Sequence, residues 1–139
     1  MSAAEQSVFA KIVRGELPCY KVFENDSVLA FLDINPLADG HTLIIPKRAA
    51  ATIDQLPDEV NAELGRCVGV VARRILRVTG AAAYNVLQNN GASAGQEVPY
   101  VHYHVIPRKP GDGLGFRWHP GKRTAAEFEA LQAAIASAE

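Results

Sequence analysis

Cysteine is scarce in this sequence: only Cys19 and Cys67 occur, far apart and in no metal-ligand spacing. Neither a disulfide framework nor a cysteine-based metal site is therefore expected, and such low cysteine use is typical of a reducing compartment. The sequence also lacks an N-terminal basic segment followed by an apolar one, and its apolar runs are far shorter than a membrane span. We expect a soluble, cytoplasmic protein that binds no membrane.

An excess of charge of either sign is missing too. Lys plus Arg number 14 and Asp plus Glu number 15, which gives a formal net charge of −1. A nucleic-acid-binding surface normally needs a basic excess, so no nucleic-acid partner is expected. No internal repeat or linker divides the 139 residues, which suffice for one domain with a substantial core. We expect a single domain over residues 1–139, with residues 108–139 as a C-terminal extension that ends in a helix.

The order of the hydrophobic patterns predicts an α+β fold. Two main helices are indicated: residues 57–80 carry apolar side chains at steps of three and four, and residues 124–137 begin with a capping box of Thr124 and Glu127. A shorter helical segment is expected at residues 7–14. Short β-branched runs between turn residues predict five strands in hairpin-like order. These strands are expected at residues 20–24, 27–33, 42–45, 84–88 and 101–106.

The most informative stretch is Gln96–Arg108, where His102 and His104 stand two residues apart in an alternating apolar run. Residues i and i+2 of a strand point to the same face, so Tyr100, His102 and His104 are predicted to share one. The preceding loop, residues 89–96, is small, polar and glycine-containing, which permits close backbone approach to a ligand. Burying an imidazole without a hydrogen-bond partner is costly, so two histidines on one strand face are unusual. Their presence here indicates a functional site.

Three roles for the histidine pair stay open from the residues alone. Both rings could be hydrogen-bonded structural residues. Both could bind a metal with His41 as third ligand, but zinc usually has three or four protein ligands, and no Cys-x-x-Cys or acidic companion accompanies the pair, so we expect no metal or other cofactor. The third role is nucleophilic attack on phosphorus, in which the second imidazole and the backbone N–H groups near Gly95 and Gln96 stabilise developing charge. We favour this third interpretation.

Residues 96–106 resemble the motif of the histidine triad (HIT) superfamily, His-φ-His-φ-His-φ-φ, where φ is apolar, with Tyr100 in the place of the first histidine. Further blocks in the same order extend the resemblance over about residues 7–110. The resemblance implies an α+β fold whose five-stranded antiparallel sheets join across a homodimer. The additional blocks are residues 9–13, 15–18, 30–36 and 40–48.

The resemblance also implies an activity: hydrolysis or transfer at the α-phosphate of a nucleoside monophosphate derivative, as in adenosine phosphoramidases. His102 would attack the phosphorus and form a nucleotidyl-histidine intermediate, His104 would contact the phosphate, and His41 would tune the histidine cluster. A purine nucleotide, a derivative of AMP or GMP, would be the substrate. Its expected contacts are Asp33 at the ribose, Phe9, Phe31, Leu32 and Ile34 around the base, and Asn89, Gly95 and Gln96 at the phosphates.

Two departures from the family pattern matter. Tyr100 keeps the backbone carbonyl that orients the nucleophile in relatives but removes an imidazole from the network with His41. A phenol with a pKa of about 10 is a poor proton carrier at neutral pH, so a slower or differently tuned enzyme is expected. Ser7 and Ala10 stand where many relatives carry a zinc-binding Cys-x-x-Cys, so no structural zinc is expected.

The resemblance leaves two other functions open. One is a dinucleoside polyphosphate hydrolase of the same superfamily, which would share the nucleotide half of the substrate and differ in the leaving group. The other is a regulatory protein that binds purine nucleotides and is catalytically weak because of Tyr100.

Overall fold

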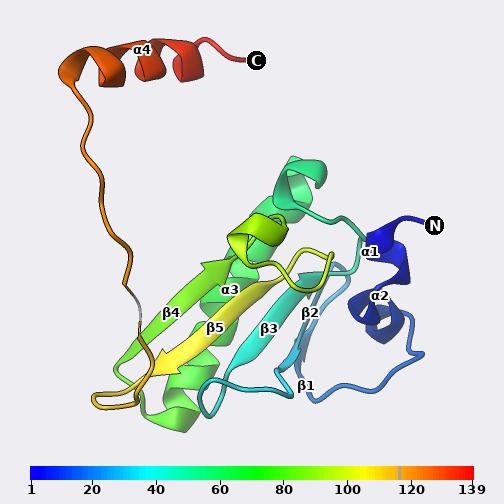
Figure 1. The fold of residues 1–139 in the computed structure, drawn as a ribbon. Helices are drawn as coiled ribbons and strands as arrows, with labels where there is room; N and C mark the ends of the chain where they lie inside the picture. The colour runs from blue at the N-terminus through cyan, green and yellow to red at the C-terminus, as the bar shows by residue number, and fades with distance from the viewer. Residues whose placement is uncertain (116) are drawn as a thin grey trace.

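The computed structural model describes residues 1–115 and 117–139. Its centre is a five-stranded antiparallel sheet with the strand order β1-β2-β3-β5-β4 (Figure 1). The predicted α+β class and five-stranded antiparallel sheet are confirmed. The strands are β1 (Lys21–Glu24), β2 (Val28–Leu32), β3 (Thr42–Pro46), β4 (Ala83–Gln88) and β5 (Tyr103–Arg108).

One face of the sheet is covered by the long helix α3, which ends at Gly80 in the left-handed conformation (φ 70°) that a glycine adopts readily. Its inner side buries Leu64, Cys67 and Val71 in a cluster with residues of β2, β3 and β5. Cys67 is therefore a core residue, as its place in the helical pattern predicted. The helices and 3-10 turns are α1 (Ala3–Gln6), α2 (Val8–Val13), η1 (Ile53–Gln55), α3 (Asp58–Thr79), η2 (Ala92–Ala94) and α4 (Ala125–Ala136).

The opposite face of the sheet carries a second apolar cluster, in which α1 and α2 pack on β2 and β3. Strand β3 supplies both clusters because its side chains alternate: Ile44 faces α3, while Leu43 and Ile45 face the second cluster. Phe9 of α2 and Tyr100 are buried in this second cluster. Both faces of the sheet are thus covered near its centre, and the polar groups that remain there are held by specific partners.

Strand β5 begins later and ends later than the predicted 101–106. Val101 donates its N–H to the carbonyl of Ala50, in a loop, so pairing within the sheet starts only at Tyr103. At the other end Pro107 lies inside the strand, where it was predicted to end it. Strand β3 pairs with β5 only as far as Val105. Pro107 has no backbone N–H to donate, but no β3–β5 hydrogen bond is lost at its position.

The C-terminal helix lies where it was predicted, and the capping box of Thr124 and Glu127 is formed. The described residues between β5 and this helix form an arm that leads away from the sheet, and every described residue from 117 to 139 is exposed (Figure 1). Among the residues that the structure describes, no helix is long and apolar enough to cross a membrane.

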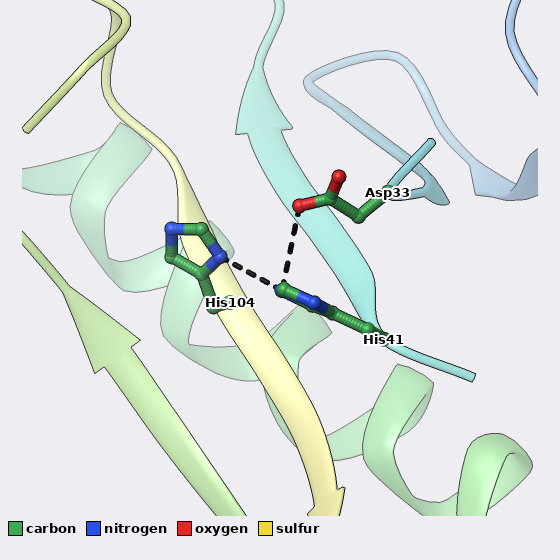
Figure 2. Close-up of side chains that lie close together, drawn as sticks. All are labelled: Asp33, His41 and His104. Atoms are coloured by element: carbon green, nitrogen blue, oxygen red, sulfur yellow. Dashed lines mark hydrogen bonds and ion pairs between the residues drawn. The ribbon is translucent and has the colours of Figure 1, made fainter. Parts of the chain in front are cut away.

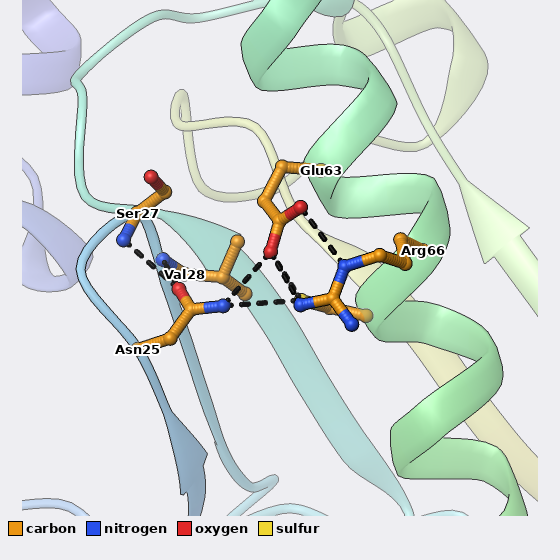
Figure 3. A network of polar contacts seen from close by, with 6 residues as sticks. Asn25, Ser27, Val28, Glu63 and Arg66 are labelled. Atoms are coloured by element: carbon orange, nitrogen blue, oxygen red, sulfur yellow. Dashed lines mark hydrogen bonds and ion pairs between the residues drawn. The ribbon is translucent and has the colours of Figure 1, made fainter.

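The turn between β1 and β2 is fastened to α3 through Asn25 (Figure 3). Its side-chain oxygen accepts the N–H groups of Ser27 at 2.9 Å and Val28 at 2.8 Å, and its amide nitrogen donates to Glu63 Oε1 at 2.9 Å. Arg66 donates two further hydrogen bonds to the Glu63 carboxylate and thereby lowers the pKa of Glu63 to about 2. The half-buried side-chain amide of Asn25 therefore joins the β1–β2 hairpin to helix α3, 38 residues further along the chain.

Replacing Asn25 with alanine is expected to lower the free energy of unfolding by about 1–3 kcal/mol, because two backbone N–H groups lose their acceptor and the Glu63 carboxylate loses one of its donors. Urea denaturation measures the change. The exposed neighbour Asp26, in the same turn, provides the matched control Asp26→Ala. Equal stability of the two variants would contradict the role assigned to Asn25.

Candidate active site

A pocket of about 650 Å³ opens beside the second apolar cluster. It gathers residues from α2, the β2–β3 connection, the β4–β5 loop and β5, which lie far apart in the sequence. Ten of the predicted site residues line it, whereas Gln96 and Tyr100 do not. The ten are Phe9, Phe31, Leu32, Asp33, Ile34, His41, Asn89, Gly95, His102 and His104.

His102 sits at the pocket immediately before β5, with 5% of its surface exposed. Its Nδ1 lies 2.7 Å from the carbonyl oxygen of Tyr100. A carbonyl can only accept, so Nδ1 carries the ring proton and Nε2 keeps its lone pair. Burial lowers the pKa of His102, although the Tyr100 carbonyl opposes the shift. The imidazole is therefore neutral at pH 7, with one nitrogen ready to act as a nucleophile or a base.

His41 and His104 form the second part of the site, and their tautomers can be deduced in the same way (Figure 2). The backbone N–H of Leu37 donates to His41 Nδ1 at 3.0 Å, so the proton of His41 is on Nε2. That Nε2 lies 2.9 Å from His104 Nδ1 and donates to it. The remaining nitrogen of His104, on the far side of the ring from His41, therefore carries a proton and is a hydrogen-bond donor.

Burial keeps this pair uncharged. The pKa of His104 is lowered to about 4, first by desolvation and then by the neighbouring His102 and His41. Burial likewise lowers the pKa of His41, and the nearby Asp33 carboxylate opposes that shift. At neutral pH the site therefore presents three neutral imidazoles, each with a defined tautomer.

The sequence predicted no acidic companion for the histidines, and this was wrong, because folding brings Asp33 next to His41. Asp33 Oδ2 lies 3.5 Å from His41 Nε2, and Oδ1 accepts the N–H of Asn35 at 2.8 Å. Asp33, His41 and His104 each offer an atom within 4.8 Å of the others, a spacing compatible with a metal ion. A metal at His41 Nε2 would have to displace the proton that the Leu37 hydrogen bond places there. The protonation pattern fits a hydrogen-bonded relay better than a metal centre.

Tyr100 acts on the site through its backbone, while its side chain belongs to the core. The phenol is fully buried, donates to the carbonyl of Pro46 at 2.5 Å and meets the ring of Phe9 edge-on at 6.2 Å. Burial raises the pKa of the Tyr100 phenol to about 12, so the phenol stays protonated and does not act as an acid or base near neutral pH. Position 100 thus orients His102 with its carbonyl and fastens the second cluster with its hydroxyl.

The zinc site that many relatives carry does not fit the residues near the N-terminus of this chain. Ser7 Oγ donates to the carbonyl of Ala4 at 2.7 Å and accepts the N–H of Ala10 at 3.2 Å, where it caps α2. Ala10 offers no ligand atom, and its side chain is buried in the second cluster. Helix capping and apolar packing occupy the positions that would hold the metal.

The loop before β5 is shaped by Gln96, which was predicted to help hold the phosphates and the leaving group. Gln96 Oε1 accepts the N–H of Gly91 at 2.7 Å, and its Nε2 donates to the carbonyl of Ala51 at 2.7 Å. Both ends of the amide are therefore engaged in closing the loop. Gly91 and Gly95 have φ angles of 95° and 91°, which few other residues adopt, and Gly95 lines the pocket.

Sequence reasoning missed part of the pocket. Leu37 contributes the amide that fixes the His41 tautomer, and no side-chain pattern signals a backbone donor. Cys19 and Leu43 also line the pocket, and the only signal for them was their closeness to segments already assigned to the base. The remaining missed residues are Val8, Ile12, Leu17, Pro18, Asn35, Leu87, Glu97, Val98 and Ile106.

The model of the HIT domain family matches residues 14–111. The chain belongs to the HIT domain family. This confirms the family resemblance seen in the sequence, and the fold agrees with it: a HIT family protein from Bacillus anthracis superposes with a TM-score of 0.90 and 37% identity, over 96% of each chain.

Two curated relatives carry names that describe an activity. The adenosine 5'-monophosphoramidase hnt1 of Schizosaccharomyces pombe is 43% identical over 94% of this chain and 96% of its own length. The adenylylsulfatase HINT3 of Arabidopsis thaliana is 47% identical over 77% of this chain, and the match spans 54% of that longer protein.

The ring tautomers can be tested by NMR. At pH 7, ¹⁵N chemical shifts are expected to show His102 with its proton on Nδ1, and His41 and His104 with theirs on Nε2. His119, in the exposed arm, provides an internal reference for a ring outside the pocket. A proton on Nε2 of His102 would overturn the tautomer deduced for this ring.

Stability is expected to fall as the pH is lowered from about 6.5 to about 4, because the unfolded state protonates His104 in this window while the folded state does not. Urea denaturation at a series of pH values measures the slope. His104→Gln should make the slope shallower, and His119→Gln should leave it unchanged. Identical slopes for both variants would show that His104 does not carry the effect.

Proposed function

We propose that this chain is a nucleotide hydrolase or transferase that acts at the α-phosphate of adenosine phosphoramidates and related nucleoside monophosphate derivatives. The observation that carries the proposal is His102, whose Nε2 is unprotonated at neutral pH and fixed at the pocket by the Tyr100 carbonyl. The relatives named adenosine 5'-monophosphoramidase and adenylylsulfatase support the substrate class, since both names describe adenylyl compounds.

The shape and chemistry of the pocket suit a nucleoside monophosphate. Its volume lies within the usual range of small-molecule sites. Phe9, Phe31 and Ile34 offer apolar surface for the base, with Leu32 beside them, and Asp33 accepts hydrogen bonds from the ribose hydroxyls. Ile34 is 76% exposed, so its side chain is accessible to a ligand. The polar loop that includes Asn89 and Gly95 then lies on the phosphate side.

The reaction proceeds by two displacements at phosphorus. His102 Nε2 attacks the α-phosphorus, the bond to the leaving group breaks, and the leaving nitrogen takes up a proton from solvent. The positive charge on the nucleotidyl-imidazole ring is stabilised by the Nδ1–H bond to the Tyr100 carbonyl. Water then attacks the same phosphorus, releases the nucleoside monophosphate and gives up a proton, while His102 departs as a neutral imidazole.

The His41–His104 relay stabilises charge on the phosphate oxygens. The free N–H of His104 donates to a non-bridging oxygen, on which negative charge builds in the transition state. Proton movement along this relay is not required, because each imidazole already holds its proton where it is needed. Leu37 and His41 act as positioning residues that keep His104 in the donating tautomer.

We further propose that the chain is a homodimer in which the β4 strands of two copies pair. Strand β4 is an edge of the sheet, and its sequence, Ala-Tyr-Asn-Val-Leu-Gln, has no charge or proline to oppose pairing. The other edge, β1, carries Lys21 and Glu24 and has an irregular register. Tyr84 and Val86 of β4 are 43% and 46% exposed, which leaves apolar surface for a partner to cover.

His102→Ala is expected to lower kcat/KM for an adenosine phosphoramidate by at least about 1,000-fold, because the nucleophile is removed. His119→Ala, outside the pocket, is the matched control. Mass spectrometry of the quenched wild-type enzyme should show the added nucleotidyl group, and a dinucleoside polyphosphate assayed in parallel identifies the preferred leaving group. AMP binding without turnover, and without any effect of His102→Ala, would instead indicate a regulatory nucleotide-binding protein.

Two substitutions at position 100 separate rate from stability. Tyr100→Phe leaves the Pro46 carbonyl without its donor and is expected to cost about 1–3 kcal/mol of stability, while kcat stays within about twofold because the backbone carbonyl is kept. Tyr100→His tests whether an imidazole at this position changes turnover, as the family pattern implies. An unchanged kcat for Tyr100→His would refute the expected tuning.

A further inference from the structure

The C-terminal helix presents an apolar stripe that its own chain does not cover. Phe128, Leu131 and Ile135 recur at steps of three and four, so they share one side of α4, and they are 60%, 54% and 73% exposed. Figure 1 shows α4 standing clear of the sheet and of the other helices. A twelve-residue helix is marginally stable in water by itself, and a helix of this length normally depends on packing.

The arm that carries this helix leaves the domain in a fixed direction. Arg108, the last residue of β5, donates to Asn85 on β4 at 2.8 Å and to the carbonyl of Leu114 at 2.6 Å. Asp112 accepts from Arg108 at 2.8 Å and from the N–H of Leu114 at 3.0 Å. The base of the arm is therefore fastened to the β4–β5 end of the sheet.

The superposition with the Bacillus anthracis protein shows that the arm is not an arbitrary tail. Residues 114–139 make up about a fifth of the 139-residue chain. A TM-score of 0.90 over 96% of both chains cannot be reached unless much of the arm and α4 follows the same path in that crystal structure. A segment that stands clear of its own domain needs a contact outside its own chain to hold a path shared by two proteins.

We propose that α4 docks on a second copy of this chain, so that two copies exchange their C-terminal arms. This inference rests on the homodimer proposed above. In a two-fold dimer the two β4 strands pair antiparallel, so the two sheets run in opposite directions. The end of the sheet near the start of α3 in one copy then lies level with the end near the C-terminus of α3 in the other copy. Figure 1 shows α4 beyond the end of the sheet at which α3 begins. In the proposed dimer, α4 of one copy therefore lies level with the C-terminal end of α3 in the other copy.

The end of α3 is suited to receive it. Val78 in the last turn is 87% exposed, and the exposed Arg73 and Arg77 surround it with positive charge. Helix α4 brings the complementary features, an apolar stripe flanked by acidic residues such as Glu129. A fully extended chain of the length of residues 113–124 can reach up to about 40 Å, enough to cross a compact domain of this size, whose radius of gyration is about 14 Å.

The test is the dimer dissociation constant, measured by sedimentation equilibrium on the full chain. Leu131→Glu/Ile135→Glu is expected to weaken the dimer at least tenfold, and Val78→Glu on the receiving surface should do the same. All three side chains are exposed within one chain, so each protomer should keep its fold, which circular dichroism checks. Ala133→Glu, on the opposite side of α4, is the matched control and should leave the dissociation constant unchanged.

The outcomes separate arm exchange from the dimer itself. Val86→Lys, on the β4 edge, should dissociate the dimer if the strands pair. A dimer that is weakened by Val86→Lys but unaffected by Leu131→Glu/Ile135→Glu would overturn arm exchange and leave the β4 dimer standing. A wild-type chain that is monomeric at all concentrations would overturn both.

Discussion

The chemistry of the site depends on one constraint: each imidazole has one nitrogen committed to a fixed partner. The Tyr100 carbonyl accepts a hydrogen bond from His102 Nδ1–H, and the Leu37 N–H donates to His41 Nδ1, which in turn determines the tautomer of His104. Burial holds the rings neutral, because a charged imidazole would lose its hydration. A lone pair and an N–H donor are thus presented side by side, and neither requires a preceding proton transfer.

This arrangement requires a segment that is not a regular strand. If residues 100–102 belonged to the sheet, their carbonyls would be directed to a neighbouring strand. Instead Val101 bonds to Ala50 in a loop, and the Tyr100 carbonyl turns back to the ring two residues later. The alternation of faces survives, since Val101 and Val105 pack towards α3 while His102 and His104 line the pocket. Because β5 pairs with its neighbours only from Tyr103 onward, the Tyr100 carbonyl is free to accept the hydrogen bond from His102.

The sequence predicted those parts of the site that depend on side-chain type and spacing. The histidine pair was singled out by residue type and spacing, Asp33 and the apolar wall by the family resemblance, and the five strands because turn residues separate β-branched runs. The sequence could not predict contacts made by the backbone, such as the Leu37 amide. The resemblance placed Gln96 at the phosphates, and the identity of this residue does not reveal that its amide also bonds to Gly91 and, across 45 residues of sequence, to Ala51.

Tyr100 stands where the family resemblance places the first histidine of the motif, and its backbone carbonyl holds the His102 ring. The group that orients His102 is a carbonyl, which every residue possesses, so the side chain is free to serve the core. In this chain it does so next to Ala10 in the second cluster, while Ser7 caps the adjoining helix. Two of the positions that hold zinc in many relatives thus contribute packing and capping here. The buried phenol donates to the carbonyl of Pro46 in β3 next to the N-terminal helices, while the orientation of the His102 ring depends on the backbone carbonyl of residue 100.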